Sequence, residues 1–242
     1  MTTWFGRPRH HFRVTDSTNE RARELALAGA PRGSVVTAAE QTAGRGRRGR
    51  SWTAPAGKAL LCSAILRPLV REHALLPLAV PLAVCEAVES LAPLECRVKW
   101  PNDVWVGERK LAGVLIEAQP PDWAVIGIGL NVAIQPAEFP AGLRQPAVSV
   151  GHGVGVEEAL AAVCERLGGW VDALGERVLA EFSRRDTLRG REVRWEGAGG
   201  ATAAGRGVAD GIDERGNLTV VTGEGERLSL GAGEVRLVAS EG

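Results

Sequence analysis

The sequence lacks several features that would place it quickly in a class of proteins. Its 29 Lys and Arg residues are balanced by 29 Asp and Glu residues, so it has no net basic charge of the kind that a general nucleic-acid-binding surface requires. The four histidines show no metal-binding spacing, and we expect no metal held by protein ligands. The four cysteines form no Cys-x-x-Cys pair and suit a reduced, cytoplasmic protein: Cys62, Cys85, Cys96 and Cys164.

The chain also shows no export signal and no membrane span. Residues 1–11 are polar and aromatic without an apolar core, and no later stretch is both long enough and free enough of charge to cross a bilayer. There is no repeat of solenoid period and no low-complexity tail. Because 45% of the 242 residues are hydrophobic, we expect a folded protein with one domain, or with a larger domain and a small second one.

Lysine and asparagine are scarce, which makes the few that occur informative. Only three of the 29 basic residues are lysine, and the chain has only four asparagines. A chain that otherwise uses arginine is expected to keep lysine where a compact ammonium group does something that a planar guanidinium cannot. These scarce residues are Lys58, Lys99, Lys110, Asn19, Asn102, Asn131 and Asn217.

The most distinctive segment is residues 44–50, Gly-Arg-Gly-Arg-Arg-Gly-Arg, which Ser51 and Trp52 follow. Arginine offers rigid donors for carboxylate and phosphate, and glycine lets backbone N–H groups approach the same oxygens. This pattern predicts an anion-binding loop beside an aromatic ring that could stack on a base. Taken alone, the segment is equally consistent with a solvated basic loop or a nucleic-acid-binding tail.

Hydrophobic periodicity predicts a first domain that mixes strands and helices. Apolar and β-branched runs predict strands over 34–40, 59–66, 97–100, 104–106, 110–118 and 123–132. Apolar residues at helical spacing predict helices over 75–91, 156–174 and 178–187, with Pro77 and Pro81 near the start of the first. Ser17 and Glu20 have the spacing of a capping box, which predicts a helix that includes residues 21–28.

The character of the chain changes after Leu188. Short strands are predicted over 191–195, 205–212, 217–221, 227–230 and 235–238, joined by glycine-rich turns. About five short strands at this spacing are typical of a small barrel. We therefore expect two domains, residues 1–187 and residues 188–242.

Four segments of the first domain together resemble a known family. They are Asp16–Asn19, Gln41–Trp52, Lys99–Asp103 with Lys110–Gly113, and Gly127–Asn131. In this order they resemble the biotin protein ligases, or biotin–[acetyl-CoA-carboxylase] ligases, from about residue 10 to the C-terminus. The resemblance implies an α+β fold: a class II synthetase-like catalytic domain with a mixed β-sheet packed against helices, then a small Src-homology-3-like β-barrel. Because the pattern begins at Asp16, we expect the monofunctional type, without an N-terminal DNA-binding domain.

The resemblance also implies a two-step reaction. Biotin and ATP, the latter with Mg²⁺, form biotinoyl-AMP and pyrophosphate, and a lysine of a biotin carboxyl carrier protein then attacks the mixed anhydride. In step one a carboxylate must approach the α-phosphate of a polyanion, so positive groups have to neutralise the repulsion, and no protein nucleophile is required. Arg45, Arg47 and Lys110 are the candidates for this role.

The resemblance assigns the remaining site residues. Neutral hydroxyl and amide groups would bind the ureido ring of biotin, and Trp52 would stack on adenine unless it is simply a core residue. The implied biotin site consists of Ser17, Thr18, Asn19, Gln41, Gly44, Arg45, Gly46, Arg47, Lys110, Gly113, Gly127 and Gly129. The implied ATP site consists of Arg47, Arg50, Trp52, Asn102, Lys110 and Asn131.

Asp103 has two interpretations. Step two needs a neutral amine from a carrier lysine whose ordinary pKa is ~10.4, so Asp103 could serve as the base. It could equally be a structural carboxylate that fixes the turn after Pro101. Together with Arg47 and Lys110, it completes the predicted catalytic set.

Two other functions fit parts of the sequence. A lipoate or octanoate ligase or transferase of the same fold would need a wider acyl tunnel and gives no reason for the arginine loop. A nucleic-acid-binding module could follow phosphates with residues 44–50 and stack bases on Trp52, but the balanced net charge opposes it. We expect neither a DNA partner nor a membrane partner, and the resemblance allows a homodimer.

Overall fold

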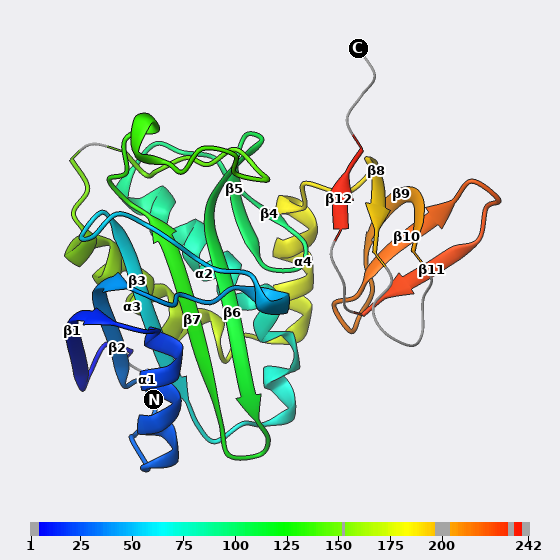
Figure 1. The fold of residues 1–242 in the computed structure, drawn as a ribbon. Helices are drawn as coiled ribbons and strands as arrows, with labels where there is room; N and C mark the ends of the chain where they lie inside the picture. The colour runs from blue at the N-terminus through cyan, green and yellow to red at the C-terminus, as the bar shows by residue number, and fades with distance from the viewer. Residues whose placement is uncertain (1–4, 152, 197–203, 232–234, 239–242) are drawn as a thin grey trace.

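Two β-sheets form the framework of the molecule (Figure 1). The structure is a computed structural model that describes residues 5–151, 153–196, 204–231 and 235–238. In the seven-stranded sheet the spatial order is β1 (Arg9–Thr15), β2 (Val35–Gln41), β3 (Ala59–Leu66), β7 (Trp123–Asn131), β6 (Arg109–Gln119), β5 (Asp103–Val106) and β4 (Cys96–Lys99). Strands β1 and β2 are parallel and the other neighbours are antiparallel, which confirms the predicted mixed sheet.

Helices cover both faces of this sheet. They are α1 (Thr18–Leu27), α2 (Leu76–Leu91), α3 (Val156–Trp170) and α4 (Gly175–Arg185). Cys62 and Ile126 belong to the core on the α2 and α3 face, whereas Ile65 and Val125 pack with Ala22 of α1 on the opposite face. Side chains alternate between the two faces along a strand. Residues of β3 and β7 that are an even number of positions from Ile65 and Val125 therefore also lie on the α1 face.

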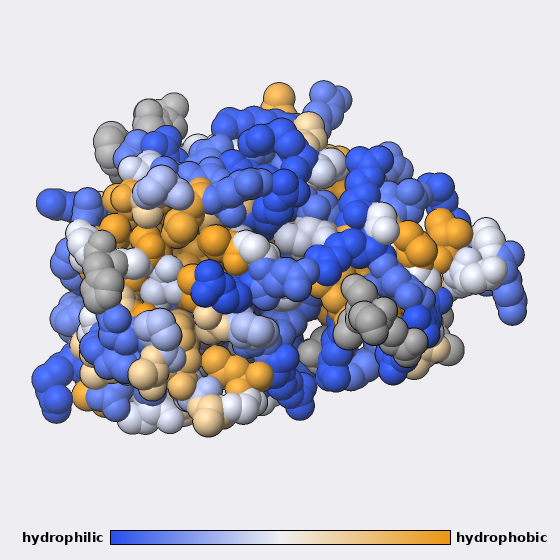
Figure 2. All heavy atoms as spheres, turned by 90° about the horizontal axis from the view of Figure 1, so that it is seen from above, coloured by the Kyte–Doolittle hydropathy of each residue, from blue (hydrophilic) through white to orange (hydrophobic). Residues whose placement is uncertain are grey.

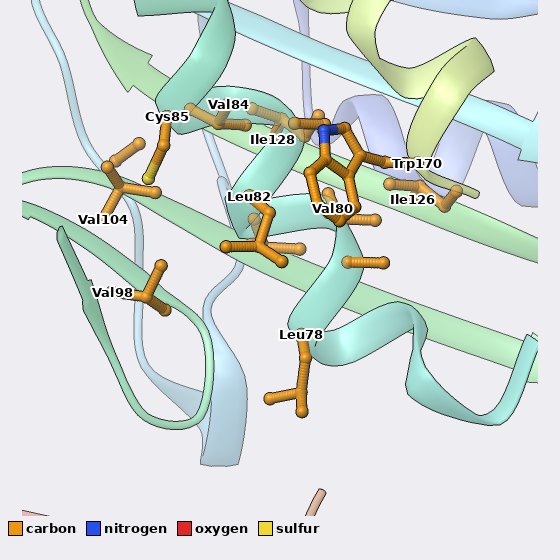
Figure 3. Packing of buried hydrophobic residues seen from close by; sticks show 14 of the residues in the cluster. Leu78, Val80, Leu82, Val84, Cys85, Val98, Val104, Ile126, Ile128 and Trp170 are labelled. Atoms are coloured by element: carbon orange, nitrogen blue, oxygen red, sulfur yellow. The ribbon is translucent and has the colours of Figure 1, made fainter. Parts of the chain in front are cut away.

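The main core lies between the sheet and helices α2 and α3. Figure 3 shows side chains from separate elements meeting there, including Leu82 of α2, Val98 of β4, Val104 of β5, Ile128 of β7 and Trp170 of α3. All of them are almost completely buried. A buried side chain of this size contributes about 1.5–3 kcal/mol, so α2 is held chiefly by packing on both sides.

One segment of this core resembles a membrane span in composition. The short 3-10 helix η2 (Arg71–Leu75) and α2 together form Arg71–Leu91, which is long and apolar enough to cross a membrane. However, 61% of the most apolar 18-residue stretch of this segment is buried inside the structure, and α2 packs on the sheet and on α3. The face of the molecule in Figure 2 is mostly hydrophilic, with hydrophobic side chains in smaller groups. The apolar character of the segment is therefore accounted for by the core.

In the first part of the chain, one strand was missed and two local predictions were wrong. Strand β1 was not predicted, because as an edge strand it is largely exposed and its sequence is polar. Ser17 is the N-cap of α1 but makes no side-chain capping bond, so the capping box with Glu20 does not form. Pro81 lies inside α2 and not near its start. Burial of the surrounding helix outweighs the backbone hydrogen bond that proline cannot make there.

The short strands predicted after Leu188 form a five-stranded antiparallel sheet. Its order is β11 (Arg227–Leu230), β10 (Leu218–Thr222), β9 (Gly205–Ile212), β8 (Glu192–Trp195) and β12 (Val235–Leu237). The connection into this sheet runs beside β4, where Thr187 N donates to Val98 O at 3.0 Å. Figure 1 shows the small domain beside α4.

Candidate active site

Two cross-strand pairs, formed by one serine and three glycines, lie at the centre of the sheet on its α1 face. Ser63 of β3 pairs with Gly127 of β7, and Gly129 of β7 pairs with Gly113 of β6. A Cβ atom at Gly127 would lie 2.0 Å from Asn19 Oδ1, and one at Gly129 would lie 2.5 Å from Trp52 Cε2. The glycines therefore leave a shallow floor, and in this structure the side chains of Asn19 and Trp52 lie directly on it.

A cavity of about 100 Å³ opens above this floor. All but two of the predicted site residues line it; the exceptions are Gly44 and Asn131. The lining set contains Ser17, Thr18, Asn19, Gln41, Arg45, Gly46, Arg47, Arg50, Trp52, Asn102, Asp103, Lys110, Gly113, Gly127 and Gly129. Pockets that hold small molecules usually measure about 300–1,000 Å³, so Trp52 and the arginine segment keep this one small.

A buried network of neutral polar groups forms the end of the cavity over β2 and β3. Gln41 Oε1 accepts hydrogen bonds from Thr18 N at 2.7 Å and from Thr18 Oγ1 at 3.0 Å. The Ser63 hydroxyl lies 2.8 Å from Thr18 Oγ1 and 2.7 Å from Asn19 Oδ1. Asn19 Nδ2 in turn donates to Glu117 Oε2 at 2.7 Å. This network fixes the donors and acceptors that a neutral polar ring would meet.

Ser63 and Glu117 were missed by the sequence analysis. Ser63 is completely buried and connects Thr18 to Asn19, although it lies outside every motif. As the one hydroxyl in the apolar strand β3, it carried a signal that could have been used. Glu117 lies near the end of β6, four residues beyond Gly113, and nothing in the sequence places it beside α1.

The arginine segment is a short hairpin with hydrogen bonds of its own. Arg45 and Ser51 form an antiparallel bridge, Trp52 N donates to Gly44 O at 2.9 Å, and Gly46 N donates to Arg50 O at 2.7 Å. A Cβ atom at Gly44 would lie 2.3 Å from Trp52 O, so only glycine allows the two sides to approach. These hydrogen bonds hold residues 44–52 in the form of a hairpin.

The arginines of this hairpin have different partners. Arg45 forms ion pairs with Glu20 at 3.3 Å and with Glu117 at 3.2 Å, which ties the hairpin to α1 and β6. Arg47 donates to Asn102 Oδ1 at 3.4 Å. Burial lowers the pKa of Arg47, and the neighbouring charge of Arg50 lowers it further. Arg47 is thus a partly desolvated cation, which an anion in the cavity would stabilise.

Lys110 and Asp103 form an ion pair at the end of the cavity over β5 and β6. Lys110 Nζ lies 2.8 Å from Asp103 Oδ1, and their side chains are 24% and 13% exposed. The same ammonium lies 5.5 Å from the centroid of the Trp52 ring. Asp103 therefore orients Lys110 in this structure.

A second, larger cavity shares Trp52 and Lys110 with the first. It measures about 750 Å³, and its lining includes Arg50, Trp52, Lys110 and Asn131. Asn131 Nδ2 donates to Val148 O at 3.0 Å, so its amide fixes the neighbouring loop. Trp52 Nε1 is buried and has no hydrogen-bond partner among the described residues. An unpaired buried donor is costly, and it marks Trp52 as a side chain that a ligand could engage.

No metal centre accompanies these groups within the described ranges. No cluster of three or more His, Cys, Asp and Glu side chains there could hold a metal ion. His152, one of the four histidines considered above, lies outside the described residues. The site consists of cations with their carboxylate partners, neutral polar groups and backbone.

Comparisons with known proteins match both parts of the chain. Residues 11–131 match the Biotin/lipoate A/B protein ligase family, and residues 174–238 match the Biotin protein ligase C terminal domain. The Bifunctional ligase/repressor BirA of Bacillus subtilis is 37% identical over 160 residues, which are 64% of this chain and 49% of that protein. The chain thus spans about half the length of this relative.

Two further comparisons extend over most of the chain. The Biotin--[acetyl-CoA-carboxylase] ligase of Mycobacterium tuberculosis is 36% identical over 232 residues, which are 91% of this chain and 85% of that protein. A solved structure, the biotin protein ligase from Aquifex aeolicus in complex with biotin and ATP, superposes with a TM-score of 0.82 at 28% identity. That match covers 96% of this chain and 100% of the other.

Proposed function

Because the chain belongs to the Biotin/lipoate A/B protein ligase family, we propose that it is an ATP-dependent biotin ligase. It activates biotin as biotinoyl-AMP and transfers the biotinoyl group to a lysine of a biotin carboxyl carrier protein. The observation that carries this proposal is the polarity of the cavity. Neutral polar groups lie over β2 and β3, and Arg47 and Lys110 approach from the side of β5 and β6.

This polarity suits a ligand with a neutral head and an anionic tail. Gln41, Thr18 and Ser17 offer hydroxyl, amide and backbone groups to the ureido ring of biotin. The apolar floor formed by the β7 and β6 glycines suits the thiophane ring and the alkyl chain. The biotin carboxylate then reaches the cations, where it can meet the α-phosphate of ATP.

Step one depends on neutralising two anions that must approach each other. Lys110 is held by Asp103, and Arg47 is held by Asn102, so both cations are oriented before the substrates bind. Preorganised charge of this kind stabilises the developing negative charge at phosphorus without reorganisation during the reaction. The described part of the chain holds no metal-binding cluster, so we propose that Mg²⁺ enters with the ATP phosphates.

The nucleotide is proposed to extend into the larger cavity. Arg50, Trp52 and Asn131 line that cavity together with Lys110, which borders both cavities. Trp52 now covers Gly113 and Gly129, and we propose that its ring turns away from them to stack on adenine. The buried, unpaired Nε1 of Trp52 would gain a partner in that movement.

Step two requires a neutral amine on the carrier lysine. We propose that Asp103 orients Lys110 during step one and accepts the proton of the carrier lysine in step two. The 2.8 Å ion pair supports the orienting role. Asp103→Asn removes both the counter-ion of Lys110 and the base, so the two steps are measured separately: slower adenylation reports the orienting role, and slower transfer from preformed biotinoyl-AMP reports the base.

The remaining proposals concern organisation and partners. We propose a domain boundary at residues 187 and 188, which is supported by the end of α4 at Arg185 and the start of β8 at Glu192. The matched C-terminal family model begins at residue 174 and so includes α4. We propose a cytoplasmic enzyme, with a homodimer as its assembly and with no DNA partner.

Two observations favour biotin ligation over the other functions. The C-terminal match is to a biotin protein ligase domain, which favours biotin over lipoate or octanoate. Arg45 is paired with two carboxylates and Arg47 lines a cavity, so the hairpin does not present a continuous basic surface to nucleic acid.

A direct assay tests the proposal. The protein is incubated with ATP and either biotin or lipoate, and pyrophosphate release is measured together with the acyl-AMP by mass spectrometry. We expect pyrophosphate and biotinoyl-AMP with biotin, and at least tenfold less product with lipoate. No biotin-dependent pyrophosphate, or equal use of lipoate, would refute it.

A further inference from the structure

A tight turn of the small β-domain, residues 213–217, touches the larger domain beside the site. Trp100 Nε1 donates to Gly216 O in this turn at 3.0 Å, and Trp100 is 3% exposed. Along the chain, Trp100 is followed by Pro101, Asn102 and Asp103. The hydrogen bond therefore connects the second domain to the segment that holds Arg47 and Lys110.

The turn is built so that the Gly216 carbonyl has a fixed position. Asp213 Oδ1 accepts from Arg215 N and Asn217 N, both at 2.9 Å, and Asp213 Oδ2 accepts from Ser229 Oγ at 2.8 Å. Gly216 has a φ of 78°, which favours glycine. These bonds make the turn a rigid element that can hold another residue in place.

The turn is also pressed against the start of α2. A Cβ atom at Gly216 would lie 2.9 Å from Leu78 Cδ1 and 3.0 Å from Leu75 Cδ2. Beside this contact is a cavity of about 280 Å³, whose lining includes Trp100 and Asn102. Packing leaves space next to the Trp100–Asp103 segment, so the hydrogen bond to Gly216 adds a restraint there.

We propose that Trp100 is a positioning residue. Through it, the small domain holds Asn102 and Asp103 where they contact Arg47 and Lys110. Asn102 receives the bond from Arg47, and Asp103 pairs with Lys110. The kinetic part of this inference rests on the proposed ligase function. Its structural part, the restraint of residues 100–103 by the turn, does not.

The test replaces Trp100 with phenylalanine, which keeps a large ring and removes the N–H donor. We expect kcat for biotinoyl-AMP formation to fall about tenfold and the KM for biotin to stay within about twofold, since a lost hydrogen bond of this kind is worth roughly a factor of two to twelve. The Val114 amide donates to Asn102 O at 3.0 Å, so its hydrogen exchange reports the position of Asn102. We expect at least threefold faster exchange at Val114 in the variant.

Trp105→Phe is the matched control. Trp105 lies in the adjacent strand β5 and is equally buried, but its Nε1 has no hydrogen-bond partner among the described residues. This control should match wild type within about twofold in both measurements, as expected when an unpaired donor is removed.

The outcomes separate the inference from the proposed function. Exchange at Val114 equal to that of the control would overturn the inference, and so would faster exchange without a fall in kcat. If wild type itself forms no biotinoyl-AMP, the ligase proposal fails, while the exchange comparison still decides whether Gly216 restrains the segment.

Discussion

Replacing Lys110 by alanine should slow biotinoyl-AMP formation by about two to three orders of magnitude. Two unit charges 4 Å apart interact by about 4 kcal/mol at an effective dielectric constant near 20, which suits a partly buried group. The Lys110 side chain is 24% exposed, so some of this energy is screened by water. A loss of about 3–4 kcal/mol in the transition state corresponds to a factor of roughly 10²–10³ in rate.

The effect should appear in kcat and not in the fold. Single-turnover formation of biotinoyl-AMP measures the chemical step, and thermal unfolding of the same sample measures stability. Because Lys110→Ala leaves the Asp103 carboxylate without its counter-ion, the double variant with Asp103→Asn serves as the stability control. A Lys110→Ala variant that forms biotinoyl-AMP within about threefold of wild type would refute the assignment, which requires a loss of about 10²-fold or more.

Lys110→Arg should also be damaging, although it keeps the charge. A Cβ atom at Gly113 would lie only 3.2 Å from Lys110 Nζ and 3.2 Å from Trp52 Cζ3, so there is little room for a planar guanidinium. We expect at least a tenfold loss of kcat. Activity equal to wild type would show that the charge alone matters and that the tight packing around the ammonium does not.

Three further predictions follow from other parts of the structure. Ser63→Ala removes a buried hydroxyl that connects Thr18 and Asn19, which costs about 1–3 kcal/mol. The Kd for biotin, measured by calorimetry, should therefore rise about tenfold. An unchanged Kd would mean that biotin binds elsewhere. Arg47→Gly should release free biotinoyl-AMP into solution faster than wild type, as measured in ultrafiltrates, and equal release would mean that Arg47 does not retain the intermediate. Burial opposes ionisation of Asp213, but hydrogen bonds from Ser229 and Asn217 hold its pKa below the ordinary 3.8. The stability that Asp213 contributes is therefore present above pH 3.8 and is lost as the pH falls through the lowered pKa. Asp213→Asn should lose less stability in acid than wild type, and identical acid unfolding curves for the two proteins would contradict this.

Much of the fold could be predicted because the sequence pattern and the tertiary environment agree. Strands β3, β9 and β11 occupy the predicted ranges. Strand β3 is a nearly continuous apolar run, whereas β9 and β11 could be located from the glycine-containing turns that separate them from β10. Strand β1 could not be found in this way, because an edge strand with one neighbour does not need an apolar face. Its place is set by pairing with β2, which is a long-range contact that local patterns do not encode.

The site shows the same division between local and long-range information. Motifs placed the cations and glycines around one cavity, but they did not show that Asn19 and Trp52 fill the space above Gly127 and Gly129. Ser63 was missed because it lies outside the motifs. The importance of Trp100 depends on Gly216, which is more than a hundred residues away in the chain.

The indole of Trp52 has a consequence for how tightly any ligand can bind. In the described state the ring lies over Gly113 and Gly129, so a ligand that needs this surface competes with a group of the protein itself. The observed dissociation constant is then the intrinsic one divided by the fraction of molecules whose indole has already turned away. A first substrate that displaces the ring removes this penalty for the second. If both substrates need the ring to move, this single side chain would couple their binding without any change elsewhere in the fold.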